Sequence, residues 1–121
     1  KKLDLKLFRA YISIFEYPVC VVIGDHKKAE KYISWKFDEE VENSAVAGRT
    51  FHKKGYAPIV WFPKIPKTSE EIGTLTHELA HVVFGIFRYI DSPSTDDTEE
   101  HFCYILGYLT REFLTQFKKT L

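Results

Sequence analysis

Two histidines stand four residues apart in the sequence HELAH, at positions 77 to 81. Side chains four residues apart share one face of a helix, so the rings of His77 and His81 can reach the same metal ion. A rotation of 100° per residue puts both rings opposite the apolar stripe of that helix. Glu78 lies one step further round, where its carboxylate can take a proton from a metal-bound water without binding the metal itself. The pattern predicts a zinc site with His77 and His81 as ligands and Glu78 as general base.

A zinc ion that does chemistry usually has a third protein ligand. The sequence DDTEEHF, which follows the expected active-site helix, offers five candidates: Asp96, Asp97, Glu99, Glu100 and His101. In helical projection Glu100 begins a mixed polar stripe, and Glu99 and His101 point about 100° away from it. That stripe continues through Tyr104, Gly107 and Arg111, apart from the apolar stripe of Phe102, Leu106, Leu109 and Phe113. The projection favours Glu100, although acidic residues in a first helical turn are also expected from the helix dipole alone.

Glycines on both expected helices bear on how closely the helices approach. Gly85 lies on the HELAH helix and Gly107 on the next one. With no side chain at either position, the two helices could pack closely enough for a carboxylate to reach the histidines. The alternative for HELAH is a chance pair of histidines on a solvated helix face.

HELAH followed by EEHFCYILGYLTREF resembles the gluzincins, the thermolysin-like zinc peptidases with HExxH and a glutamate on the next helix. More narrowly, it is similar to small phage and prophage proteins that pair HExxH with an E-x-F-x-Y-x-x-G-Y helix and are taken as metallopeptidases of unknown substrate. The matching residues, within a specific region of 68–114, are Glu100, Phe102, Tyr104, Gly107 and Tyr108. The resemblance implies that His77, His81 and Glu100 bind Zn²⁺, that Glu78 is the base, and that a peptide or protein is the substrate. It also implies a small zincin-like domain that acts in the cytoplasm of a host cell.

Thermolysin-like enzymes have a further domain that supplies a transition-state donor, whereas about twenty residues follow Glu100 in this sequence. We therefore expect the donor within the chain. Tyr104 is the first candidate, with a packing role as its alternative; His101, His52 and Arg88 come next. The substrate is expected to lie extended along AVAGRTF or PIVWF by main-chain pairing.

A second function stays open beside the peptidase. In it the metal joins the two C-terminal helices of a non-catalytic phage assembly or interaction protein. Structural zinc sites are normally closed by four protein ligands. A fourth ligand could come from His101, Asp97 or a partner chain.

The expected strands and helices that position these residues form a single α+β domain spanning 1–121. We expect strands within 3–15, 19–24, 45–52 and 58–62, and a helix from Asp25 to Phe37. Pro58 and Pro63 bracket the last strand, which is typical of an edge strand. Thr68 and Glu71 form a capping box, so the HELAH helix begins there and runs to about Ile90. The turn DSPS ends it, and the last helix begins near Asp96 or Asp97 and continues through Phe117.

Composition narrows the class of protein. The 17 Lys and Arg residues balance 17 Asp and Glu residues, which argues against a nucleic acid or an anionic membrane as partner. Cys20 and Cys103 both lie in apolar runs and are expected to be buried, reduced thiols. No apolar run approaches the roughly 20 residues that a membrane span requires. An intracellular, cytoplasmic protein is the expectation.

Overall fold

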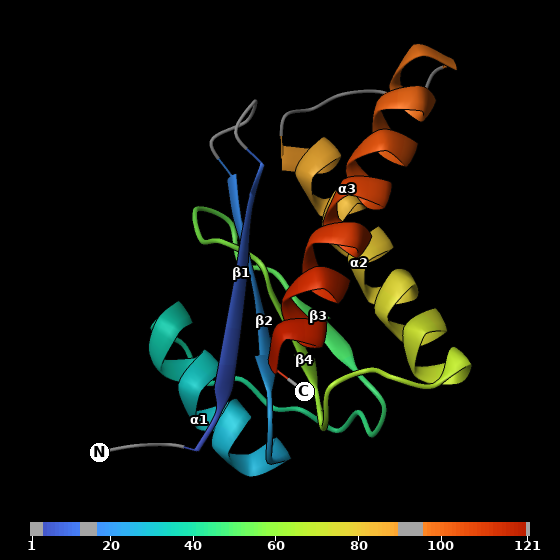
Figure 1. The fold of residues 1–121 in the computed structure, drawn as a ribbon. Helices are drawn as coiled ribbons and strands as arrows, with labels where there is room; N and C mark the ends of the chain where they lie inside the picture. Colours follow the sequence, from blue (N-terminus) through green and yellow to red (C-terminus); the bar gives the residue numbers. More distant parts are fainter. Residues whose placement is uncertain (1–3, 13–16, 90–95, 121) are drawn as a thin grey trace.

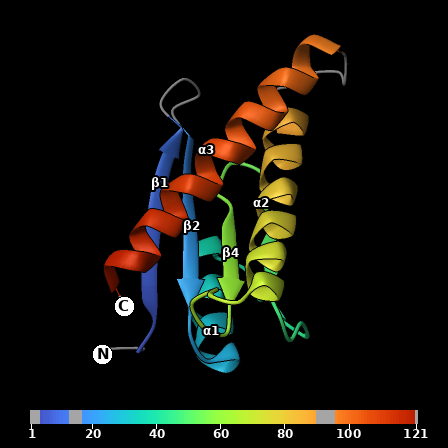
Figure 2. The same ribbon diagram turned by 45° about the vertical axis from the view of Figure 1, so that its right-hand side comes forward.

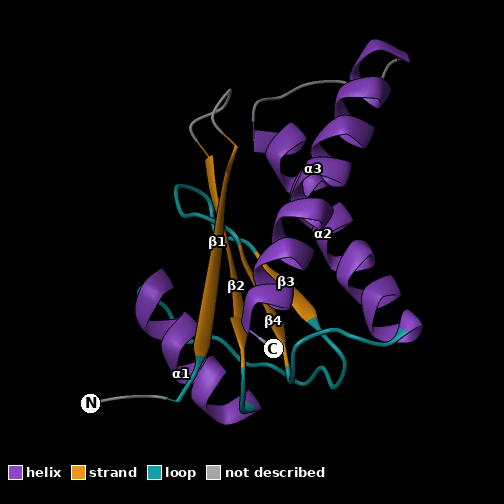
Figure 3. Cartoon of the chain, in the orientation of Figure 1, coloured by secondary structure: helices purple, strands orange, loops and turns teal. Residues whose placement is uncertain are grey.

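A computed structural model describes residues 4–12, 17–89 and 96–120 of the chain. Its elements are, in order, β1 (Lys6–Ile12), β2 (Tyr17–Ile23), α1 (His26–Phe37), β3 (Arg49–Phe51), β4 (Ile59–Phe62), α2 (Ser69–Tyr89) and α3 (Asp96–Thr120). The predicted α+β class is confirmed: one helix lies between the strands in sequence, and two helices follow them (Figure 3). The expected DSPS turn, Ile90 and the side chains of Asp96 and Asp97 lie outside the described residues.

The four strands form one mixed sheet in the order β1-β2-β4-β3. β2 pairs antiparallel with β1 and parallel with β4, and β3 pairs antiparallel with β4. The prediction that residues 58–62 form an edge strand is therefore wrong, because β4 is paired on both sides. Pro58 and Pro63 lie just outside Ile59–Phe62, and the Pro58 carbonyl accepts a hydrogen bond from the Cys20 N–H at 3.2 Å. The missing proline N–H groups thus cost the ladder nothing, and β3 is the edge next to α2.

Helix α1 covers one face of the sheet, and α2 and α3 cover the other (Figure 1). The alternation of β2 shows why its sequence is apolar throughout. Val19, Val21 and Ile23 belong to the core under α2 and α3, whereas Cys20 and Val22 belong to the core under α1. A strand buried on both faces needs apolar residues at every position, as the sequence YPVCVVI provides.

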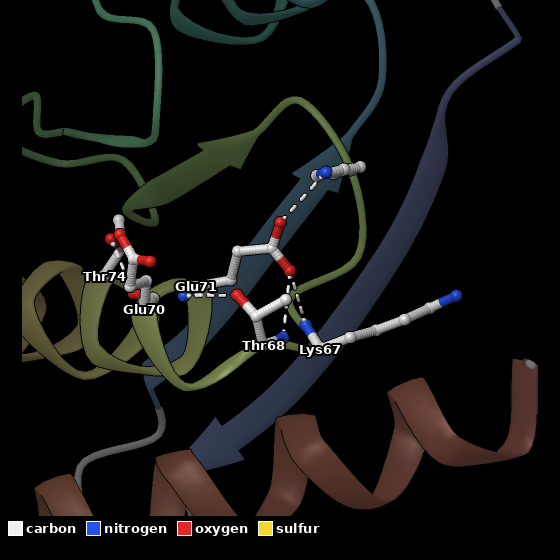
Figure 4. Close-up of polar contacts among 6 residues, drawn as sticks. Lys67, Thr68, Glu70, Glu71 and Thr74 are labelled. Carbon is white, nitrogen blue, oxygen red and sulfur yellow. Dashed lines mark hydrogen bonds and ion pairs between the residues drawn. The ribbon is translucent and has the colours of Figure 1, made fainter.

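The first turn of α2 is fixed by the predicted capping box (Figure 4). Thr68 Oγ1 accepts the Glu71 N–H at 3.1 Å, and Glu71 Oε1 accepts the N–H groups of Lys67 and Thr68 at 3.0 Å. These hydrogen bonds, with the Lys64 amine 3.1 Å away, lower the pKa of Glu71 to about 2. Because the cap sets where α2 begins, it also sets which way each later side chain on α2 points.

The apolar stripe predicted for α2 packs on the sheet. Leu75, Leu79, Val83 and Ile86 are buried, and Ile72 is half-buried. On α3 the buried residues are Ile105, Leu109, Phe113 and Phe117, with Phe102 and Leu106 half-buried beside them.

Helix α3 runs back across the sheet to β1 (Figure 2). The rings of Phe8 and Phe117 meet edge to face with centroids 5.0 Å apart. Gln116 Nε2 donates to the Arg9 carbonyl at 2.7 Å, and the Tyr108 hydroxyl on the same helix donates to the Tyr11 carbonyl at 3.1 Å. The sheet therefore holds α3 chiefly through its C-terminal half.

The two cysteines differ in environment. Cys20 is buried, and burial raises the pKa of its thiol. Cys103 is exposed, so the prediction that it is buried is wrong. It lies in an apolar run, but only one side of α3 packs on the sheet, and Cys103 is not on that side. Among the described residues, no helix is both long and apolar enough to cross a bilayer.

Candidate metal centre

The two histidines of HELAH lie side by side on the exposed face of α2. Their Nε2 atoms are 3.3 Å apart, and their rings meet at 79° with centroids 4.9 Å apart. Both residues are exposed to solvent. The four-residue spacing and the capped start of α2 thus bring His77 and His81 together as predicted.

This separation fits a shared metal ion. Two nitrogens that each lie 2.0–2.1 Å from one tetrahedral zinc ion are about 3.3–3.4 Å apart. The Nε2 atoms of His77 and His81 already have that spacing. The histidine pair therefore suits two ligand positions of zinc.

Glu78 is buried on α2 and is held from the neighbouring strand. Glu78 is only 8% exposed. The hydroxyl of Thr50, on β3, lies 2.7 Å from Glu78 Oε1 and 2.9 Å from the Glu78 carbonyl oxygen. One hydroxyl proton serves both oxygens, so Thr50 ties the carboxylate and the backbone of Glu78 to β3. The other carboxylate oxygen, Oε2, lies 4.0 Å from Nε2 of His77. One oxygen is thus anchored, and the other lies near the histidine pair.

Glu100, the predicted third ligand, does not join the pair. Within residues 4–12, 17–89 and 96–120, no set of three or more His, Cys, Asp or Glu side chains is placed to hold a metal ion. Glu100 is exposed on α3, as are Tyr104, Gly107 and Arg111 of the same stripe. The described conformation therefore places two imidazoles side by side, without a carboxylate from α3 beside them.

The packing of α2 against α3 explains this separation. The ring of Phe102 on α3 lies against the ring of Phe84 on α2, with centroids 4.6 Å apart. These two residues therefore lie at the same height along the two helices. The helices run in opposite directions (Figure 2). Glu100 comes two residues before Phe102, and His81 three before Phe84, so they lie on opposite sides of this contact. At 1.5 Å per residue, about 7 Å of helix length separates Glu100 from His81. The polar stripe also lies opposite the buried stripe, so Glu100 points to solvent.

The glycines do not bring the two helices together as predicted. A side-chain carbon added at Gly107 would meet nothing within 4 Å, so the α3 glycine is not at a close approach. A carbon added at Gly85 would overlap the ring of His52, whose Nδ1 would be 2.7 Å away. Gly85 therefore makes room for a histidine from the end of β3 and not for α3.

His52 stands beside His81 and the end of α2. Burial of the ring lowers the pKa of His52, and the nearby positive charge of Arg88 lowers it further, while the backbone of His81 raises it. His52, a secondary candidate for the transition-state donor, thus lies beside His81, and Arg88, another such candidate, lies near His52. Tyr104, the first candidate, is 75% exposed on α3, and in the described part of the chain no hydrogen bond or ring contact joins it to either histidine. His101 is likewise exposed on α3.

Thr50 was not singled out by the sequence, although a signal for it existed. Alternate residues of a strand point to the same face, so Thr50 and His52 both point toward α2, whereas Phe51 between them is buried under α1. A Thr-x-His pair on a strand was therefore a usable pattern. Its contact with Glu78, across 28 residues of sequence, required the fold.

Comparison with known proteins finds no match among protein families, curated proteins or solved structures.

Proposed function

We propose that this protein is a zinc-dependent peptidase with a zincin-like domain, in which His77 and His81 bind the metal and Glu78 is the general base. The observation that carries the proposal is the 3.3 Å separation of the two Nε2 atoms. It matches two positions of a tetrahedral zinc site, on a face open to solvent and next to a held carboxylate. The resemblance to phage-type proteins leads us to propose the host cytoplasm as the place of action.

The roles of the protein's own groups follow from their positions. When bound, zinc would lower the pKa of a water molecule to about 7 and polarise a peptide carbonyl. Oε2 of Glu78 is the oxygen that would accept a proton beside the histidines, because Thr50 occupies Oε1. The Thr50 hydroxyl limits the freedom of the carboxylate, so Oε2 stays near the histidines. Holding the base in place removes a reorganisation cost from the reaction.

The substrate most simply lies along β3. This strand is an edge of the sheet, and through Thr50 it contacts the helix that carries the site. An extended peptide added to that edge would pass the histidine pair. A donor for the developing negative charge is then needed nearby; His52 and Arg88 are better placed for this than Tyr104.

We keep Glu100 as the proposed third ligand, which requires the first turns of α3 to shift along α2 and to turn Glu100 from solvent toward the histidines when zinc binds. Among the described residues, the contact between the two helices beside Glu100 includes the rings of Phe84, Phe87 and Phe102. A shift would bring a carboxylate to an otherwise two-ligand site.

Metal analysis and peptide hydrolysis test the proposal together. The purified chain is expected to bind about one zinc ion, as three-ligand catalytic sites do. His77→Ala and His81→Ala should abolish that binding, whereas the control His101→Ala, an exposed histidine on α3, should keep it. Glu78→Gln should keep the zinc and lose peptide hydrolysis by at least about 100-fold, the usual contribution of a general base. Glu70→Gln is the matched control on the same helix.

Two results would decide against this function. A wild-type chain that binds no zinc would remove the metal centre altogether. Zinc binding without hydrolysis of any peptide in a mixed library would instead favour a non-catalytic assembly or interaction protein.

A further inference from the structure

A cavity of about 680 Å³ adjoins the histidine site at the end of β3. We call it the β3–β4 pocket, because the loop from His52 to Ala57 forms one wall. Gly85, Arg88 and Tyr89 of α2 form a second wall, and Tyr17 and Pro18 at the start of β2 complete it. His52 and Gly85 therefore belong both to this pocket and to the surroundings of His81.

The pocket is lined by positive charge, and none of the described residues that line it is acidic. Its cations are Lys53, Lys54 and Arg88. Lys53 is already neutralised by Glu39, whose carboxylate lies 3.2 Å from its amine. In the part of the chain that the structure describes, no carboxylate forms an ion pair with Lys54 or Arg88. Two cations thus remain available to a negatively charged ligand.

The remaining walls suit a peptide. Tyr17, Tyr56 and Tyr89 line the pocket, and the rings of Tyr17 and Tyr89 have centroids 6.2 Å apart. Tyrosine offers an apolar ring to a side chain or backbone and a hydroxyl to a polar group. An Arg guanidinium binds a carboxylate through two parallel hydrogen bonds.

The pocket lies at a defined distance from the histidine pair. Gly85 and Arg88 follow His81 by four and seven residues, which corresponds to about 6 and 10 Å along the helix. An extended peptide advances about 3.3 Å per residue. A ligand group in the pocket would therefore sit two or three residues from a bond held at the histidines.

We propose that the β3–β4 pocket binds a carboxylate of the substrate, held by Arg88 and Lys54, two or three residues from the cleaved bond. The choice of this substrate class rests on the proposed peptidase function. An Asp or Glu side chain and a free C-terminus present the same group, and they imply an acidic endopeptidase site and a carboxypeptidase site respectively. Either way the enzyme discriminates by charge and not by an apolar pocket.

The binding test uses the full chain with a metal chelator, so that neither zinc nor turnover is needed. Three peptides are titrated by calorimetry: acetyl-Ala-Ala-Glu-Ala-Ala-amide, the same peptide with Gln, and acetyl-pentaalanine with a free carboxylate. At least one of the two carboxylate peptides should bind about tenfold more tightly than the Gln peptide, in keeping with a charge-assisted pair. The tighter of the two identifies the source of the carboxylate.

Variants connect the preference to the pocket. Arg88→Gln and Lys54→Gln should each reduce it to less than about threefold, as loss of one charged partner predicts. The matched control Arg111→Gln, an exposed arginine on α3, should retain it. Equal affinity for all three peptides, or a preference that survives Arg88→Gln and Lys54→Gln, would overturn the proposal.

The test separates this proposal from the peptidase function. A carboxylate preference without hydrolysis of any peptide supports the pocket and removes the peptidase. Hydrolysis that ignores charge removes the pocket and leaves the peptidase standing.

Discussion

The face of α2 that carries Glu78 and the face of α3 that carries Glu100 differ in what packs against them. Glu78 lies against β3, is 8% exposed and is bonded through Oε1 to Thr50. Glu100 lies on the side of α3 that faces away from the sheet, and it is exposed. The difference teaches that a carboxylate is positioned by the element opposite it and not by its place in a motif.

The separation of two side chains on one helix is also determined differently from the separation of two side chains on different helices. The four-residue spacing of His77 and His81 fixes their separation, because the backbone hydrogen bonds of one helix fix the rise and rotation. Nothing comparable links Glu100 to His81. Their relation depends on where Phe84 and Phe102 meet, that is, on how two separate helices pack.

Removal of the Glu100 carboxylate tests most directly whether this face of α3 contributes to the zinc site. If α3 shifts to supply the third ligand, Glu100→Ala should weaken zinc affinity at least about tenfold, the lower end of what even outer-shell partners of a metal site contribute. The control Glu99→Ala should leave affinity unchanged, since residue 99 is rotated about 100° from residue 100. Competition with a chromophoric chelator measures both. Equal affinities would mean that the face of α3 stays outside the site.

Removing the partner of Glu78 tests the other side of the comparison. Thr50→Val keeps the shape of the side chain but deletes the hydroxyl that binds Oε1. We expect peptide hydrolysis to fall about tenfold, because the base is no longer held, while zinc affinity stays within about twofold. Thr50→Ser restores the hydroxyl and should restore most of the activity. Equal rates for the Val and Ser variants would show that Thr50 has no positioning role.

The two glycines give a comparison in stability. Gly107→Ala should stabilise the protein by about 0.5–1 kcal/mol, because alanine favours the helix and the site is open. Gly85→Ala gains the same helix propensity but must displace the ring of His52, an exposed residue, which opposes that gain. The Gly85 variant should therefore be the less stable of the two by up to about 1 kcal/mol in urea unfolding, the lower end of an overpacking cost. Equal stabilities would contradict the contact between His52 and α2.

The smallest expected effect is at the start of α2. The folded-state pKa of Glu71 is about 2, below the ordinary 4.5, so its charge stabilises the folded chain above about pH 4.5 and stops doing so as the pH falls toward 2. Glu71→Gln should lower Tm by no more than about 3 °C at pH 7. The difference from wild type should shrink between pH 4.5 and 2. Glu70→Gln, on the same turn, is the control, and a Tm difference independent of pH would contradict the charge argument.

Contacts between residues a few positions apart could be predicted from the sequence. Asp25 accepts the Lys27 and Lys28 N–H groups as the expected N-cap of α1, and Thr68 with Glu71 forms the expected capping box. The buried side of α2 and the histidine pair also followed from helical periodicity. These features depend on backbone geometry that the sequence specifies locally.

Contacts between residues on different strands and helices could not be predicted. The central place of β4 depends on its pairing with β2, which proline positions do not reveal. The partner of Gly85 was expected on α3 and is His52. In each case the sequence pattern was compatible with several partners. The packing of the whole core determined which partner is in contact.

The contact between Phe8 and Phe117 joins residues separated by roughly 110 positions. A ribosome adds about 5–20 residues per second. The side of β1 that α3 covers is therefore synthesised several seconds before the helix that will cover it. The unit of β3, β4 and α2, with its Thr50–Glu78 bond across 28 residues, is complete earlier. During synthesis the candidate metal centre thus precedes the helix that closes the sheet, and the apolar face of β1 and β2 is the surface that a growing chain has to shield.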